Sequence, residues 1–219
     1  MADVWQFLVK GGIMMIPLAL CSILALAIVI EKTFSLRRKA VIIPEVVSVL
    51  QNIKGPDDIG LALSICEKYE GPFANVIRVG LESRHQPKEE IKETLTDAGR
   101  QEVRTLEHGL VILETVAGIA PLLGLLGTVI GILKVFNVIS TLGVGQAAAL
   151  SGGISEALIT TIIGLSIGIP AVVVFNYFTN KAEDFIMDIE KYSSELIKKV
   201  TSFQTSKVTN RVEADAISS

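Results

Sequence analysis

The chain has 219 residues, a formal net charge of −3 and a mean hydropathy of +0.53, and half of its residues are apolar while only a fifth are charged. This composition is too apolar for an ordinary soluble domain, which argues against a soluble enzyme. We expect no nucleic-acid partner.

Three long apolar segments carry no charged residue: Gly11 to Ile30, Thr115 to Leu133 and Ala157 to Asn180. Each is long enough, at about 1.5 Å per residue, to cross a hydrocarbon core of about 30 Å. A buried helix of a soluble protein could imitate one such segment, but three in one short chain favour a membrane protein. We therefore predict an all-α membrane protein whose transmembrane helices cover residues 11–30, 111–136 and 154–180.

The first apolar segment is predicted to be a retained anchor and not a cleaved signal peptide. Its apolar run is longer than the usual signal-peptide core of about 7–15 residues. Glu31, Lys32 and the basic run at 37–39 follow it, where a small-residue cleavage site would otherwise lie.

The distribution of Lys and Arg predicts the orientation of the three spans. Residues 31–114 hold twelve of these basic residues and the chain after residue 180 holds six, whereas the first ten residues hold only Lys10 and the connection from Lys134 to Gly153 holds only Lys134. Basic residues near the ends of spans favour the cytoplasmic side. We expect a protein of the bacterial inner membrane with a short periplasmic N-terminus at residues 1–10, a periplasmic loop at 137–153 and a cytoplasmic C-terminus.

Residues 31–110 are predicted to form a cytoplasmic helical domain. Gly and Pro residues divide its first half into short pieces, of which Phe73 to Leu81 is typical of a short helix. After Pro87, apolar residues recur at helical intervals and no proline follows until Pro121. This pattern predicts one long helix that continues into the second span.

The third span is predicted to continue into the cytoplasm in the same way. Apolar residues such as Phe185 and Ile189 recur at steps of three and four, which predicts an amphipathic cytoplasmic helix over residues 181–200. Residues 201–219 are polar with little periodicity, and we expect a disordered tail there.

The sequence contains no pattern typical of an enzyme, a metal site or a bound cofactor. His85 and His108 have no Cys or carboxylate at the spacing of metal ligands, so both are expected to be solvated.

Gly127 and Gly131 in the second span, and Gly164 and Gly168 in the third, form Gly-x-x-x-Gly pairs. Such pairs let helix backbones approach closely within a membrane, so these four glycines are predicted to serve helix packing.

Proline within a span removes a backbone donor, and Pro121 and Pro170 are therefore expected to kink the second and third helices.

Polar side chains within the spans are the candidates for function. Glu156 stands at the head of the third span, where a carboxylate is costly unless it faces water, a partner or a proton. The alternative is that Glu156 serves only as an acidic residue in the first turn of a helix.

Thr128 lies six residues from Lys134, and Thr161 lies five residues from Glu156, so both hydroxyls are roughly 8 Å below the same end of the spans. They could line a polar path, although hydroxyls at such places usually bond the preceding turn. Threonine cannot hold a charge midway, so a second acid would have to come from another chain.

Two segments resemble a known family. The sequence AGIAPLLGLLGTVIGIL at 117–133 and the sequence GGISEALITTIIGLSIGIPAVVVFNYF at 152–178 resemble the second and third spans of the ExbB/TolQ/MotA proton-channel family, and its ExbB/TolQ branch most closely. GPFANVIRVGL at 71–81 resembles a recurrent cytoplasmic element of that branch. MotA-type subunits have four spans, and the three predicted here argue against that branch.

The resemblance implies a homopentamer that encloses two single-span partners of the ExbD/TolR type, which carry the missing aspartate. It implies that Thr128 and Thr161 line the ion path, that Thr160 adds a hydroxyl beside them, and that Glu156 lies at the outer entrance. It further implies that the proton motive force drives an envelope protein of the TonB/TolA type, with membrane lipid around the first span. A non-conducting membrane scaffold is the alternative, and residue types alone leave open whether the ion is a proton or sodium.

Overall fold

The computed structural model describes residues 11–143 and 147–217, and these residues form helices and no strand. Of the side chains within that part, those of residues 142, 149 and 204–217 lie outside the description. The predicted periplasmic N-terminus, residues 1–10, and the last two residues of the predicted tail also lie outside it.

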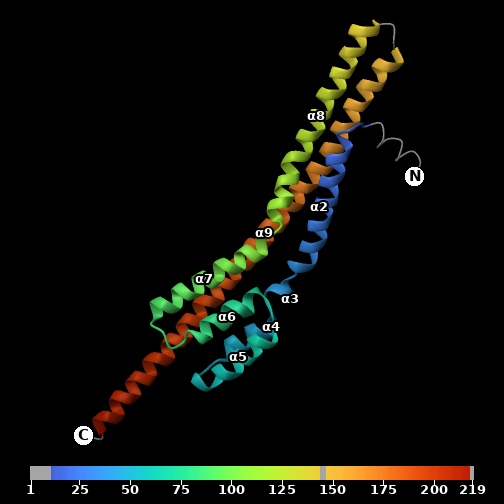
Figure 1. The fold of residues 1–219 in the computed structure, drawn as a ribbon. Coiled ribbons are helices and arrows are strands. Elements are labelled where there is room, and N and C mark those ends of the chain that lie inside the picture. Colours follow the sequence, from blue (N-terminus) through green and yellow to red (C-terminus); the bar gives the residue numbers. More distant parts are fainter. Residues whose placement is uncertain (1–10, 144–146, 218–219) are drawn as a thin grey trace. The chain divides into compact units, whose positions relative to one another are not determined.

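Figure 1 shows the helices in chain order. Three of them are long and apolar enough to cross a membrane: α2, α8 and the first part of α9. The prediction of an all-α protein with three membrane-spanning helices is therefore confirmed. The bounds are α2 (Met15–Ser35), α3 (Arg38–Val41), α4 (Pro44–Asn52), the 3-10 helix η1 (Pro56–Asp58), α5 (Ile59–Lys68), α6 (Pro72–Glu82), α7 (Lys88–Glu107), α8 (Leu110–Leu142) and α9 (Ala147–Ile217).

The chain divides into two compact units. The membrane unit comprises the described parts of residues 1–32 and 109–179, and the extramembrane unit comprises residues 33–108 together with the described part of 180–219. The long helix α9 contributes to both units, because its composition changes from apolar to amphipathic after Asn180 without a helix-breaking residue.

The membrane unit is held together by contacts between apolar side chains of α2 and the other two helices. Leu18 of α2 is fully buried against Val116 and Ala120 of α8. Most other side chains of α2 are exposed, including Ile16 and Ile23. An apolar helix with an exposed apolar surface is what contact with lipid requires.

The extramembrane unit is built around α6, whose apolar residues are spaced so that one side is buried. Phe73 of α6 is fully buried, and its ring lies 5.1 Å from the ring of Tyr192 in α9. Gly80 of α6 lies against Leu95 of α7 and Leu196 of α9. The predicted short helix at 73–81 is thus present as α6, and it brings α7 and α9 of this unit together.

The predicted continuous helix leading into the second span is wrong, because α7 ends at Glu107 and α8 begins at Leu110. Gly109 adopts a φ of +84°, a left-handed conformation that cannot continue a right-handed helix. A Cβ at this position would also lie 3.3 Å from Cδ1 of Ile28 in α2. Close packing against α2 therefore accompanies the break.

The connection between α8 and α9 is shorter than the predicted loop of residues 137–153. Helix α8 continues to Leu142 and ends at Gly143, whose φ is +78° and whose N–H donates to Ile139 O at 3.0 Å. This is a common glycine ending of a helix. Helix α9 begins at Ala147 within an alanine-rich stretch that favours helix.

The far end of α9 also differs from the prediction. The helix runs to Ile217, whereas the sequence predicts a helix ending at residue 200 and a disordered tail after it. The segment after residue 200 contains neither Gly nor Pro, so no residue in it interrupts the helical backbone.

Candidate functional site between helices α8 and α9

Helices α8 and α9 approach each other through glycines. A Cβ placed on Gly164 of α9 would lie 2.6 Å from Ala120 O and 2.9 Å from Gly124 Cα of α8. These atoms belong to the backbone and cannot move aside as a side chain can. The two helices are therefore in backbone contact, which is the arrangement that small residues permit inside a membrane.

The four glycines singled out in the sequence all lie in this contact. Besides Gly164, Gly127 lies against the side chain of Thr160, and a Cβ on Gly131 would come 2.8 Å from Cβ of Ala157. The close approach extends for several turns. It positions the polar side chains of α8 and α9 opposite one another.

The two prolines lie within otherwise continuous helices, Pro121 in α8 and Pro170 in α9. The ring of Pro121 fills the space beside the fourth glycine, since a Cβ on Gly168 would lie 2.5 Å from Pro121 Cγ. Pro170 is exposed. Pro121 thus takes part in the α8/α9 contact.

The hydroxyls of Thr128 in α8 and Thr161 in α9 are directly hydrogen-bonded to each other. Thr128 Oγ1 also lies 3.1 Å from Ala157 O of α9, and Thr161 Oγ1 lies 3.2 Å from Gly124 O of α8. Each hydroxyl therefore reaches a carbonyl of the opposite helix. Counting residues from Lys134 and Glu156 predicts that the two hydroxyls lie at the same depth, and in the structure they are in contact.

Thr160 differs from its two neighbours. It has no exposed surface, and its hydroxyl bonds its own helix, 2.9 Å from Ala157 O and 3.2 Å from Glu156 O. Its side chain packs against Gly127. These contacts are those of a packing residue that satisfies its hydroxyl on the preceding turn.

Glu156 forms an ion pair close to the place where the chain passes from the end of α8 to the start of α9. Lys134 Nζ of α8 donates to Glu156 Oε1 at 2.5 Å, and the side chain of Glu156 is 17% exposed. Gly12, just before α2, lies so close that a Cβ on it would overlap Glu156 Oε1. The carboxylate of α9 is therefore bordered by Lys134 of α8 and by the segment that precedes α2.

Sequence reasoning missed three residues of this site. The sequence pattern marks Lys134 as a basic residue at the end of the second span and not as a site residue, although a lysine near a span end opposite an acid is a recognisable signal. Gly12 and Gly124 gave no signal of their own, because neither forms a Gly-x-x-x-Gly pair with the glycines singled out in the second span. Their contacts depend on how the helices pack.

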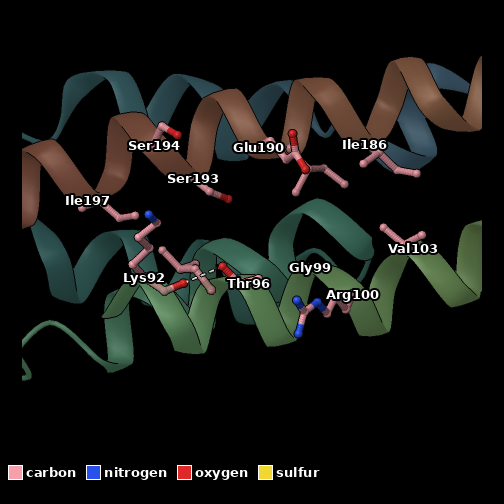
Figure 2. A pocket seen from close by; sticks show the side chains of 12 residues that line it. Lys92, Thr96, Gly99, Arg100, Val103, Ile186, Glu190, Ser193, Ser194 and Ile197 are labelled. Carbon is pink, nitrogen blue, oxygen red and sulfur yellow. Dashed lines mark hydrogen bonds between the residues drawn. The ribbon is translucent and has the colours of Figure 1, made fainter. Parts of the chain in front are cut away.

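A separate cavity of about 460 Å³ lies within the extramembrane unit, between α7 and α9. Figure 2 shows Lys92, Thr96 and Arg100 of α7 on one side and Glu190 and Ser193 of α9 on the other. Thr96 donates to Lys92 O at 2.8 Å, within its own helix. The cavity is distinct from the polar site of the membrane unit.

The described residues contain no cluster of three or more His, Cys, Asp or Glu side chains that could hold a metal ion. His85 and His108 are both exposed. Cys66 of α5 is buried, and this burial raises the pKa of its thiol to about 11. A thiol that stays protonated near neutral pH is a poor nucleophile and a poor metal ligand.

Comparison with known proteins gives consistent matches. The profile of the MotA/TolQ/ExbB proton channel family matches residues 68–191. A putative biopolymer transport protein, an ExbB homolog from Methanothermobacter thermautotrophicus, is 31% identical over 196 residues, which cover 89% of this chain and 67% of the relative. The biopolymer transport protein ExbB of Xanthomonas campestris is 37% identical over 106 residues, 48% of this chain and 42% of that protein.

A relative with the other branch name is also similar. The Tol-Pal system protein TolQ of Pseudomonas aeruginosa is 42% identical over 86 residues, 39% of this chain and 37% of that protein. The alignments thus span about two thirds of the first relative and less than half of the other two. Because the family profile covers more than half of the chain and relatives of both names align with it, the chain belongs to the ExbB/TolQ branch of the MotA/TolQ/ExbB proton channel family.

Proposed function

We propose that the chain is a subunit of an inner-membrane proton channel that couples the proton motive force to work on envelope proteins. Membership of a proton-channel family supports the class of function. The observation that carries the proposal for this chain is the hydroxyl pair of Thr128 and Thr161, which lies below the carboxylate of Glu156 in an otherwise apolar helix pair.

The hydrogen bonds of the threonine pair suit proton relay. Each hydroxyl has one proton, and both a carbonyl of the opposite helix and the other hydroxyl are within reach as acceptors. The pair can therefore be ordered in either direction, with Thr161 donating to Thr128 or the reverse. Such a pair passes a proton along but cannot retain one, because threonine does not titrate in the relevant range.

An acid that holds the proton midway must therefore come from another chain. Between residues 115 and 180 the only charged residues are Lys134 and Glu156. We propose that a single-span protein of the ExbD/TolR type supplies an aspartate facing the threonine pair. In this arrangement five copies of the chain enclose two such partners, with the first span of each copy facing lipid.

Proton entry would then produce movement. Each elementary charge that crosses the membrane gains about 2.3 kcal/mol for every 100 mV of potential. Protonation removes the charge of the partner's aspartate and so changes which polar group of the ring it prefers. Repeated cycles would turn the partner relative to the ring and transmit force to an envelope protein of the TonB/TolA type.

The experiment is a proton-flux measurement on the chain co-purified with its single-span partner and reconstituted in vesicles with an imposed potential. We expect Thr161→Val and Glu156→Ala each to reduce flux at least tenfold while the complex remains assembled. The matched control is Thr115→Val, because Thr115 lies in the same α8 but is exposed and bonds only Val111 O of its own helix.

Normal flux in both Thr161→Val and Glu156→Ala would contradict the proposal. If these variants change only the thermal stability of the complex, the polar residues serve packing alone. The chain would then be a non-conducting scaffold, for which the glycine contacts and the locally bonded hydroxyl of Thr160 are the supporting observations.

A further inference from the structure

The two members of the ion pair between Lys134 and Glu156 differ in their exposure to solvent, unlike those of a simple surface salt bridge. The lysine is 52% exposed, whereas the glutamate is only 17% exposed. The ammonium therefore covers a carboxylate that is otherwise largely enclosed by protein. Among the described residues, Lys134 is the cation paired with this carboxylate.

The same carboxylate oxygen is confined from a second direction. Gly12 has a φ of +68°, and a Cβ on it would overlap Glu156 Oε1. The N–H of Met15 donates to Gly12 O at 3.1 Å and so ties this glycine to the first turn of α2. Oε1 thus has the backbone of the segment before α2 on one side and the Lys134 ammonium on another.

The oxygens deeper in the site are also engaged. Gly124 O and Ala157 O, together with the hydroxyls of Thr128 and Thr161, accept or donate hydrogen bonds within the α8/α9 pair. These are the types of oxygen that would replace the water shell of a sodium ion. A sodium ion entering the site would need several of them at once.

A proton places different demands on the site. It bonds to a single carboxylate oxygen, occupies almost no volume and needs no coordination shell. A proton and a sodium ion add the same positive charge to Glu156, so repulsion by the Lys134 ammonium alone does not distinguish them. A sodium ion would also need room beside Oε1 for itself and for several oxygen ligands, and Gly12 and the Lys134 ammonium, which its charge holds at 2.5 Å, lie on two sides of this oxygen.

We propose that Lys134 is a specificity-determining residue that makes the entrance at Glu156 accept protons and exclude sodium. The inference rests on the proposed function, because it concerns the ion that passes Glu156. It assigns Lys134 a role in choosing the ion and leaves the relay to the threonine pair.

The test compares the wild-type complex with Lys134→Gln and Lys134→Arg, each co-purified with the single-span partner and reconstituted in vesicles. Proton flux and the uptake of radioactive sodium are measured under the same imposed potential. We expect the wild type and Lys134→Arg to carry protons without measurable sodium uptake. Lys134→Gln should take up sodium at least tenfold faster than the wild type, and external sodium should slow its proton flux.

Each outcome separates the inference from the function on which it rests. A Lys134→Gln complex that assembles, carries protons and excludes sodium as the wild type does would overturn the role of Lys134 and leave the channel intact. Sodium uptake by the wild type would also overturn it. Failure of the wild-type complex to carry any ion would overturn the proposed function, and the inference with it. Size-exclusion profiles identify loss of fold, and Lys134→Arg shows whether the positive charge is what matters.

Discussion

Thr128 Oγ1 and Thr161 Oγ1 are hydrogen-bonded across the contact between α8 and α9, although the two residues are 33 positions apart in the chain. The contact is possible because Gly124 and Gly164 bring the helix backbones together one turn away. Packing and polar chemistry are therefore coupled in this site. A change in either the glycines or the threonines is expected to affect the other.

Thr128→Val should separate the polar role of this residue from its shape. Valine preserves the volume but removes the hydroxyl that reaches Ala157 O and Thr161, so we expect proton flux to fall at least tenfold. The lost hydrogen bond should cost about 1 kcal/mol of stability. Flux assays in vesicles and thermal unfolding in detergent give the two readouts. Thr128→Ser, which retains the hydroxyl, should restore most of the flux; equal loss in both variants would contradict the relay.

Gly164→Ala should disrupt the close approach of the helices. The new methyl group would meet the backbone of α8 at 2.6 to 2.9 Å, so the helices must move apart, at a cost of about 1–3 kcal/mol. The matched control is Gly118→Ala in α8, where the new methyl group would have nothing within 4 Å apart from its chain neighbours and the backbone of its own helix. Thermal unfolding of the two variants should show a lower midpoint for Gly164→Ala alone. Equal midpoints would mean that the backbone contact is dispensable.

Lys199→Met should loosen the end of α4. Lys199 Nζ donates to both Leu50 O and Gln51 O at 2.7 Å, and these carbonyls belong to the last turn of α4, where a helix leaves carbonyls without N–H donors of its own. We expect a loss of about 1 kcal/mol and faster hydrogen exchange in the last turn of α4. Lys198→Met, at an exposed neighbouring position, should leave exchange in α4 unchanged. Identical exchange in both variants would exclude this role of Lys199.

The buried thiol of Cys66 should make stability depend on alkaline pH. Its pKa is raised from 9.0 to about 11 because burial disfavours the thiolate. The folded chain therefore holds the proton where the unfolded chain has lost it, so this contribution is complete below about pH 9 and declines as pH rises towards 11. Between pH 8 and 10 the unfolding midpoint should fall more for the wild type than for Cys66→Ala. An equal fall in both would show that Cys66 does not contribute.

The features that could be predicted from the sequence are those that depend on the residues of one continuous segment. Hydropathy over some twenty residues identified the three spans, and counting residues from Lys134 and Glu156 indicated that Thr128 and Thr161 share a depth, because a helix rises by a fixed amount per residue. The glycine pairs could be recognised for a similar reason, since four residues return to nearly the same side of a helix.

Features that depend on packing between distant segments could not be predicted. The break at Gly109 requires a positive φ, which a glycine permits but does not impose. The contact of Gly12 with Glu156, and that of Lys199 with Leu50, join residues more than a hundred positions apart. No local pattern records such pairs. These contacts exist only because the fold brings distant helices together.

The most direct test of the central claim is proton uptake by vesicles that hold either the chain alone or the chain with its single-span partner, under the same imposed potential. The account predicts uptake only when both proteins are present, because the chain supplies the threonine pair and Glu156 while the partner supplies the acid that holds the proton midway. Equal uptake with and without the partner, or no uptake by the assembled pair, would contradict it.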